Sequence, residues 1–237
     1  MHIPRYRRIK INSFNNIMTQ SQSSGFIFEN EAREKLFGLP SELNNTRPGF
    51  DIAAKDNIYN TGNVSIKSVK SGGNLCFSSI QRFRREIYND DSDTKGLVIK
   101  YKQNGDYKEV INIFELDLTA ARDYLFSTLP ADQIDEYCDL VKKIPAGKPS
   151  ADCKLSYKTQ KNALKKMYPC AININPKVDS KTQRRVQCSV TRFEEKLRDY
   201  IIYESMRDTG KPNLYKGKEI SLKIYSPQRK GNKSNTE

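Results

Sequence analysis

Two side chains with complementary chemistry, the carboxylate of Asp51 and the ammonium of Lys67, are separated by a single turn-rich segment of the chain. The surrounding sequence predicts one short strand near Phe50 to Lys55 and a second near Asn63 to Val69. A carboxylate and an ammonium held side by side can orient a water molecule and stabilise negative charge. Whether Asp51 and Lys67 can act together depends on the elements that position them.

Alternation along the two predicted strands indicates which side chains share a face. On the second strand, Val64 and Ile66 are expected to face the core, which leaves Ser65 and Lys67 on the opposite face. On the first strand, Asp51 lies between two apolar residues and therefore points away from their side. We expect Asp51 and Lys67 to meet.

A second carboxylate comes from a helix predicted over about Phe26 to Phe37. Its apolar stripe runs through Phe28, Ala32 and Leu36. At about 100° per residue, Glu29 lies at the edge of that stripe. Glu29 is thus the acid of this helix that we expect to be half-buried beside the sheet.

Composition excludes several kinds of catalysis. The only histidine is His2, near the N-terminus, which argues against Ser-His-Asp and Cys-His hydrolases and against zinc sites that need histidine. The five cysteines form no C-x-x-C pair, and their odd number favours a reducing, intracellular compartment. No stretch has the length and apolar character of a membrane-spanning helix, so no membrane partner is expected.

Glu29, Asp51 and the x-Ile66-Lys67 strand, in this order, resemble the PD-(D/E)XK nuclease superfamily with its restriction-endonuclease-like fold. The resemblance covers roughly residues 25 to 88. It implies that Asp51, Glu29 and the Ile66 carbonyl hold Mg²⁺ and that Lys67 positions or activates the attacking water. It further implies in-line hydrolysis of a phosphodiester, leaving 5′-phosphate ends.

One position departs from the family pattern. Ser65 stands where the family has Asp, Glu or Gln, two residues before the lysine. Related restriction enzymes with such a departure carry the acid on the following helix, and here Gln81 falls near that place, with Glu86 further along. The remaining metal ligand is left open among Ser65, Gln81 and Glu86.

The pattern of the whole chain predicts the α/β class, and the resemblance implies a restriction-endonuclease-like central mixed β-sheet flanked by helices. A flexible basic arm (residues 1–24) and a basic tail (226–237) are expected to flank one nuclease domain (25–225), with its catalytic core over about 25–115 and a DNA-binding part over about 140–205. Further elements are expected as helices near Ser79 to Tyr88, Ala120 to Leu129, Asp132 to Lys143, Lys154 to Met167 and Phe193 to Ser205, and strands near Leu97 to Tyr101, Val110 to Phe114, Ala171 to Asn175 and Arg185 to Thr191.

The charge is strongly positive and unevenly distributed. Lys and Arg number 41 against 28 Asp and Glu, for a net charge of +13. Residues 106–139 hold nine acids and two bases, whereas residues 140–192 hold thirteen bases and two acids. Double-stranded DNA is the expected partner, because a concentrated positive surface suits a phosphate backbone.

Two segments are expected to contact the DNA. On the helix after the lysine strand, Arg82 and Arg85 flank the core stripe and suit phosphate contacts. The last two predicted strands form a basic β-hairpin whose polar face can contact base edges, and whose loop carries basic side chains. The hairpin residues predicted to bind DNA are Asn173, Asn175, Lys181, Arg184, Arg185 and Gln187.

These observations predict a Mg²⁺-dependent endodeoxyribonuclease, most concretely a site-specific type II restriction endonuclease, dimeric if its target is palindromic. A structure-selective repair or recombination nuclease of the same superfamily is the nearest alternative. In a further alternative, a non-catalytic nucleic-acid-binding protein, Ser65 marks a lost site and the basic surface is the whole function. An RNA-binding protein is less well supported, because no RNP-like motif is present.

Overall fold

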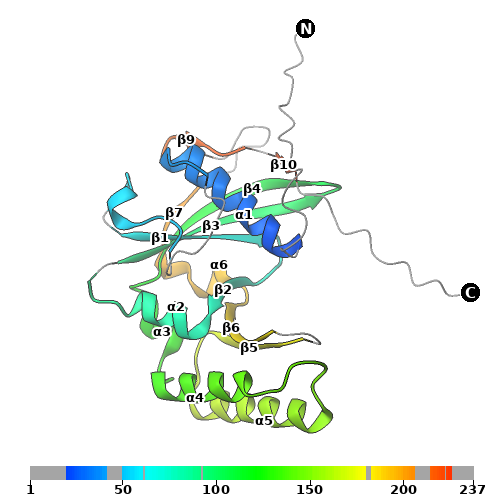
Figure 1. Ribbon diagram of the computed structural model, residues 1–237. Helices are drawn as coiled ribbons and strands as arrows, with labels where there is room; N and C mark the ends of the chain where they lie inside the picture. The colour runs from blue at the N-terminus through cyan, green and yellow to red at the C-terminus, as the bar shows by residue number, and fades with distance from the viewer. Residues whose placement is uncertain are drawn as a thin grey trace, which may run out of the picture.

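The computed structural model is an α/β fold built around a mixed, curled β-sheet with helices on its faces (Figure 1). It describes residues 20–41, 50–60, 62–91, 93–179, 183–205, 214–221 and 223–225. Within these residues, no helix combines the length and the apolar character needed to cross a bilayer.

The central sheet has five strands in the order β1-β3-β4-β10, with β7 also paired to β4. The first pair, β1 and β3, is parallel, and all the other pairs are antiparallel. β1 therefore forms one edge of the sheet. The strands are β1 (Asn63–Lys70), β3 (Thr94–Asn104), β4 (Tyr107–Asp117), β7 (Ile201–Glu204) and β10 (Lys223–Tyr225).

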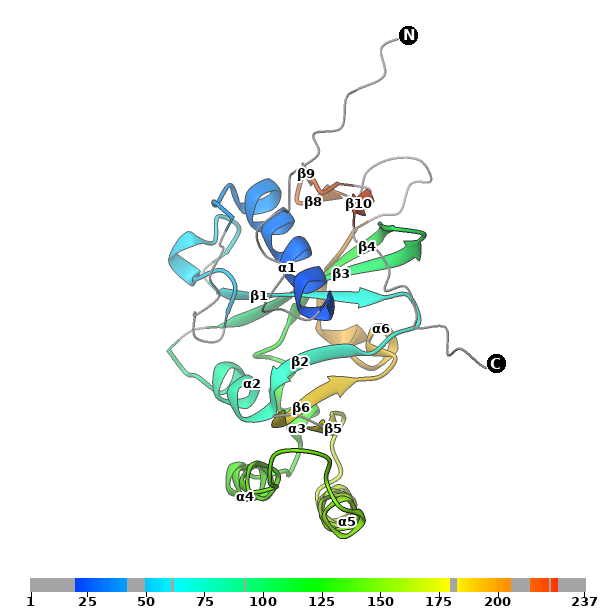
Figure 2. The ribbon, with the colours of Figure 1, turned by 45° about the vertical axis from the view of Figure 1, so that its right-hand side comes forward.

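A smaller antiparallel sheet has the order β2-β6-β5 and lies between the central sheet and a pair of helices (Figure 2). Its strands are β2 (Leu75–Ser79), β5 (Asn173–Val178) and β6 (Arg184–Val190). The helices around it are α2 (Ile80–Ile87), α3 (Arg122–Phe126), α4 (Ala131–Lys142), α5 (Ala151–Met167) and the short α6 (Phe193–Lys196).

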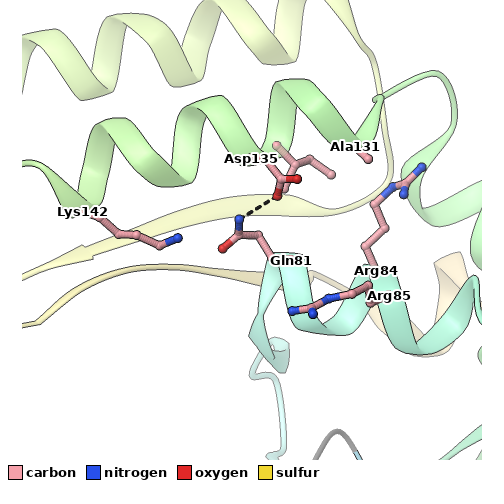
Figure 3. Close-up of a pocket in the computed structure, with 7 residues that line it drawn as sticks. Gln81, Arg84, Arg85, Ala131, Asp135 and Lys142 are labelled. Atoms are coloured by element: carbon pink, nitrogen blue, oxygen red, sulfur yellow. Dashed lines mark hydrogen bonds between the residues drawn. The ribbon is translucent and has the colours of Figure 1, made fainter.

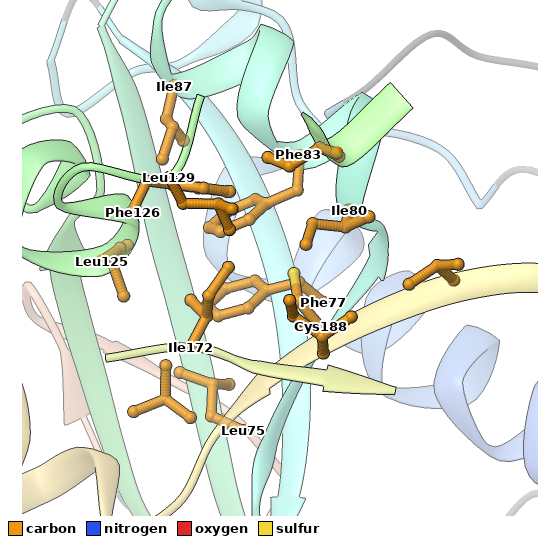
Figure 4. Packing of buried hydrophobic residues seen from close by; sticks show 14 of the residues in the cluster. Leu75, Phe77, Ile80, Phe83, Ile87, Leu125, Phe126, Leu129, Ile172 and Cys188 are labelled. Carbon is orange, nitrogen blue, oxygen red and sulfur yellow. The ribbon is translucent and has the colours of Figure 1, made fainter. Parts of the chain in front are cut away.

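Two apolar clusters cover opposite faces of the central sheet. One contains Phe28, Ala32 and Leu36 of helix α1 (Gln20–Ala32) and of the π-helical turn that follows it (Arg33–Phe37). The other cluster joins the second face of the sheet to α2, α3, α4 and the small sheet (Figure 4). Within this cluster, the rings of Phe77 and Phe83 stack with their centroids 3.9 Å apart. Alternation along β1 and β3 produces both clusters, because successive side chains enter opposite cores.

A two-stranded ribbon, β8 (Leu214–Tyr215) and β9 (Lys218–Glu219), covers the α1 side of the sheet. Both residues of its connection have positive φ, 48° at Lys216 and 85° at Gly217. This backbone suits a two-residue hairpin turn, and it directs Tyr215 into the α1-side cluster.

Most predicted elements are present, and the others differ as follows. The strand expected near Phe50 to Lys55 is only a bridge at Ile52 followed by a 3-10 turn (Ala54–Asp56), because the side-chain oxygen of Asn63 accepts the Ala54 N–H at 2.8 Å and turns the chain away. The helix expected to end at Ser205 stops at Lys196 and leads through a 3-10 turn into β7, which pairs with β4.

No sequence pattern indicates the four strands β2, β8, β9 and β10, and the partner of β2, strand β6, lies far along the chain. The helix expected over Ala120 to Leu129 covers only Arg122–Phe126. At the N-terminus, α1 begins at Gln20, within the arm predicted over residues 1–24. Residues 1–19 and the predicted tail (226–237) lie outside the described residues.

Candidate active site and nucleic-acid interface

The free edge of β1 holds Asp51 by a single backbone bridge. The Asp51 N–H donates to the Val64 carbonyl at 2.8 Å, and the Val64 N–H donates to the Ile52 carbonyl at 2.8 Å. Ile52 is fully buried in the α1-side cluster. The Asp51 carboxylate therefore points away from that core and along the edge of β1.

Lys67 meets Asp51 at this edge, as the alternation predicts. The Lys67 ammonium donates to Ser65 Oγ at 2.6 Å and to the Ile66 carbonyl at 2.8 Å, and it lies 3.4 Å from Asp51 Oδ2. The same Asp51 oxygen accepts the Ile66 N–H. Both side chains keep some exposure, 22% for Lys67 and 14% for Asp51, so solvent and substrate can reach them.

Arg33 holds the Asp51 segment from the helix side, a role that the sequence patterns did not indicate. Its guanidinium is buried, with Nη1 donating to the Asp51 carbonyl and Nε to the Pro40 carbonyl at 3.3 Å. Arg33 lies one residue beyond the buried Ala32, where the turn is π-helical. A cation placed behind the backbone of Asp51 fixes that residue without competing for its carboxylate.

Glu86 of α2 shares the electrostatic environment of this edge. Burial raises the pKa of the Glu86 carboxyl, and the Asp51 carboxylate raises it further, while Arg82 and Lys67 act in the opposite direction. Arg82 Nε pairs with Glu86 Oε1 at 2.9 Å. Arg82, predicted as a phosphate contact, thus also positions Glu86. Among the residues left open as the remaining ligand, Glu86 is a carboxylate coupled to both Asp51 and Lys67.

Glu29 and Gln81, two of the predicted site residues, are not part of the contacts around Asp51 and Lys67. Glu29 belongs to α1, which packs on the face of the sheet opposite to α2. Gln81 donates to Asp135 of α4 at 2.6 Å, in a hollow of about 420 Å³ between α2 and α4 (Figure 3). No contact in the described residues links either side chain to Asp51 or Lys67.

The atoms at the β1 edge that could bind a metal are all oxygens, which suits a hard cation such as Mg²⁺. The Ser65 hydroxyl, the Ile66 carbonyl and Asp51 already converge on one cation, the Lys67 ammonium. The described residues contain no group of three or more His, Cys, Asp or Glu side chains able to hold a metal. The oxygens that meet at this edge are those of Asp51, Ser65 and the Ile66 carbonyl, and the Glu86 carboxyl is electrostatically coupled to Asp51 and Lys67.

The predicted hairpin is present as β5 and β6, paired antiparallel in the small sheet. The apolar side chains on one face of the hairpin and just before it are buried: Ile172, Ile174, Val186, Cys188 and Val190. On the polar face, Asn175 donates to Ser189 Oγ at 2.8 Å, and Gln187 is half-buried. Lys177 and Arg185 lie directly opposite each other and are both exposed. Like charges in this arrangement repel, and an anionic partner relieves the repulsion.

A lysine stripe on α5 adjoins the same face. Lys165 reaches Asn173 at the start of β5, with its ammonium 3.4 Å from Asn173 Oδ1. Lys154, Lys158 and Lys161 lie at helical spacing before it, and none of these lysines forms an ion pair with another described residue. The β5–β6 face and α5 together form a basic surface suited to a phosphate backbone.

Arg184 has a different role from the predicted DNA contact. Its side chain is 9% exposed, and it donates to the carbonyls of Ile144, Pro145 and Gly147 in the α4–α5 loop. It also binds the carbonyls of Asp179 and Gln183 beside it. A guanidinium engaged by so many carbonyls anchors the loop rather than binding a ligand. Lys181, also predicted to bind DNA, lies outside the described residues.

Comparison with protein-family models, with curated proteins and with solved structures gave no match. The functional argument therefore rests on the residues of this chain.

Proposed function

We propose that this protein is a Mg²⁺-dependent endodeoxyribonuclease that hydrolyses double-stranded DNA, with a restriction-endonuclease-like fold. One observation carries the proposal: at the edge of β1, Lys67 lies within reach of the Asp51 carboxylate and of the Ile66 carbonyl. This is the acid, strand carbonyl and lysine combination that the sequence resemblance implies.

Each residue then has a defined task. Asp51, Glu86 and the Ile66 carbonyl hold the cation, which when bound neutralises charge and lowers the pKa of water. Lys67 holds the attacking water at its ammonium and stabilises the negative charge that develops on the phosphate. Arg33 fixes the backbone of Asp51, and Arg82 orients Glu86.

The substrate is expected to lie along two positive regions. Arg85 is exposed on α2, one residue before Glu86, and it lines the hollow between α2 and α4. The β5–β6 face with α5 supplies the second region, where Arg185, Gln187, Asn173 and Asn175 have the side-chain types that contact base edges. Site-specific cleavage, as by a type II restriction endonuclease, is the form of the proposal that uses this polar face.

Incubation of the purified protein with a long duplex DNA, in Mg²⁺ and in EDTA, tests the proposal. The variants are Asp51→Asn and Lys67→Met. Lys70→Met serves as the matched control, because Lys70 is an exposed lysine on the same strand. Discrete, Mg²⁺-dependent fragments from the wild type and the control, absent with the two variants, are the expected result.

Other products would change the conclusion. A smear, or preferential cutting of branched substrates, would replace site specificity by structure selectivity. DNA binding without cleavage, equal in all four proteins, would overturn the catalytic proposal. It would support a DNA-binding protein, a second candidate that the opposed Lys177 and Arg185 favour because it needs only the basic surface.

A further inference from the structure

Buried Glu115 of β4 lies at the centre of a polar network outside the proposed catalytic residues. Its carboxylate is 2% exposed. Lys216 of the β8–β9 ribbon pairs with Glu115 Oε2 at 2.7 Å, and Asn60 Nδ2 donates to Glu115 Oε1 at 2.9 Å. Burial raises the pKa of the Tyr215 hydroxyl, and the Glu115 carboxylate raises it further. Three segments far apart in the sequence thus meet at one buried charge.

Asn60 belongs to the segment that carries Asp51. Asn57 Nδ2 donates to Asn60 Oδ1 and to the Gly62 carbonyl, both at 2.7 Å, and the Gly62 N–H returns to Asn60 Oδ1 at 3.0 Å. Tyr59 Oη donates to the Leu36 carbonyl at 2.5 Å. The chain between Asp51 and β1 is therefore tied by side chains at its far end.

These ties are needed because the segment has little regular backbone pairing. Asp51 and Ile52 form only a bridge with Val64, and a 3-10 turn follows. A segment without a ladder opens readily unless side-chain contacts hold it. Arg33 holds one end at Asp51, and Glu115 holds the other end through Asn60.

The ammonium of Lys216 is well placed to keep this anchor closed. It lies 5.3 Å from the ring centroid of Tyr59 and 5.2 Å from that of Tyr215, so two aromatic rings flank the cation that neutralises Glu115. Without this cation, Glu115 would be a buried charge left with the neutral Asn60 amide. Such a charge draws in water or neutralises, and either change weakens its hold on Asn60.

We propose that Lys216 and Glu115 are positioning residues, through which the C-terminal ribbon holds the Asp51 segment in place at the candidate active site. The coupling itself is a property of the fold. Its consequence for catalysis rests on the proposed function.

Hydrogen exchange measured by mass spectrometry tests the coupling without any assumption about activity. Lys216→Met should speed exchange in residues 51–60 by about tenfold relative to β3, although the substitution is in the ribbon. Lys218→Met is the matched control, because Lys218 is on the same ribbon and contacts the Tyr59 ring without pairing with Glu115. Lys216→Arg should restore slow exchange, because it retains the cation.

A second variant covers the case in which Lys216→Met fails to fold. Asn60→Ala removes the link between Glu115 and the Asp51 segment and leaves the Lys216 ion pair intact, so it should give the same local change. Unchanged exchange of residues 51–60 in the folded variants, or an equal change with Lys218→Met, would overturn the proposal.

Cleavage kinetics then separate this proposal from the proposed function. If the wild type cleaves DNA, Lys216→Met should lower kcat about tenfold while DNA affinity in EDTA stays unchanged, and Lys216→Arg should recover kcat. Faster exchange in a protein that cleaves no DNA would retain the coupling and remove the proposed function. Cleavage of DNA by the wild type, with exchange unaltered in Lys216→Met, would retain the proposed function and remove the coupling.

Discussion

Two lysine–carboxylate pairs occupy different surroundings in the same sheet. Lys216 and Glu115 lie 2.7 Å apart, and the carboxylate is 2% exposed beneath tyrosine rings. Lys67 and Asp51 lie 3.4 Å apart at the free edge of β1, where the carboxylate is 14% exposed. The first pair joins segments that are distant in sequence, whereas the second is held by one bridge and by Arg33.

The difference shows that the surroundings, and not the residue types, decide what such a pair can do. Glu115 is 2% exposed and is held between the Asn60 amide and the Lys216 ammonium, so that carboxylate has no access to substrate. Asp51 keeps partial exposure beside a strand carbonyl and a second carboxylate. We therefore expect substitutions in the two pairs to separate activity from stability.

Removal of the edge lysine should have the largest effect. Lys67→Met is expected to lower Mg²⁺-dependent cleavage by about 10²- to 10⁴-fold, because a positioned proton-transfer or charge-stabilising group contributes that much. Its free energy of unfolding should fall by less than about 3 kcal/mol, the cost of breaking a fully buried pair, because both side chains keep some contact with solvent. Initial rates on duplex DNA and urea denaturation measure both quantities. Retained cleavage would remove Lys67 from the mechanism.

Removal of the buried-pair lysine should have its larger effect on stability rather than on cleavage. Lys216→Met leaves the Glu115 charge buried without its cation, and we expect the free energy of unfolding to fall by about 3 kcal/mol. Urea denaturation of this variant beside Lys218→Met measures the difference. Equal stability of these two variants would show that the Glu115 pair does not act as a buried ion pair.

Glu86→Gln probes the second carboxylate at the edge. The folded protein holds the Glu86 proton more tightly than the unfolded chain, because burial raises the pKa of this carboxyl. The unfolding free energy of the wild type should therefore fall as pH rises above the ordinary pKa of 4.5, and the variant should lack this decline. Denaturation across that pH range measures it.

The same variant tests the metal site. Binding of a cation needs the ionised carboxylate, so Mg²⁺ affinity of the wild type should increase with pH over the same interval. Glu86→Gln should weaken Mg²⁺ binding by about tenfold or more, as measured by calorimetry. Equal affinity in both proteins would exclude Glu86 as a ligand.

Arg85→Gln should have the smallest effect, because the substitution removes only one expected contact with the phosphate backbone of the DNA. The slope of log affinity for duplex DNA against log salt should become shallower by about 0.9 in EDTA. Arg198→Gln is the matched control, an exposed arginine that pairs with Glu204 away from α2. An unchanged slope for Arg85→Gln would place the DNA elsewhere.

Elements whose core stripes lie within one segment could be predicted from the sequence. Ile80, Phe83 and Ile87 are buried on α2 as their spacing predicts, and the β5–β6 pairing follows from its alternating residues. The strand expected around Asp51 is wrong, because the nearby Asn63 side chain binds the Ala54 N–H and turns the chain. The helix predicted from Phe193 to Ser205 begins where expected but ends at Lys196, because residues 201–204 pair with distant β4 instead.

Alternation along β1 was enough to predict that Lys67 and Ser65 share the face away from Val64 and Ile66, because side-chain direction in a strand is a local property. Asp51 reaches Lys67 as predicted, although the strand expected around Asp51 is only a bridge at Ile52. The positive charge of residues 140–192 is likewise a property of composition. Tertiary structure alone decided that Glu86 rather than Gln81 is coupled to this edge, that Arg184 anchors a loop, and that Glu115 joins Asn60 to Lys216. Each of these depends on how α2, the small sheet and the C-terminal ribbon pack, and packing between distant segments leaves no periodic signal in a single sequence.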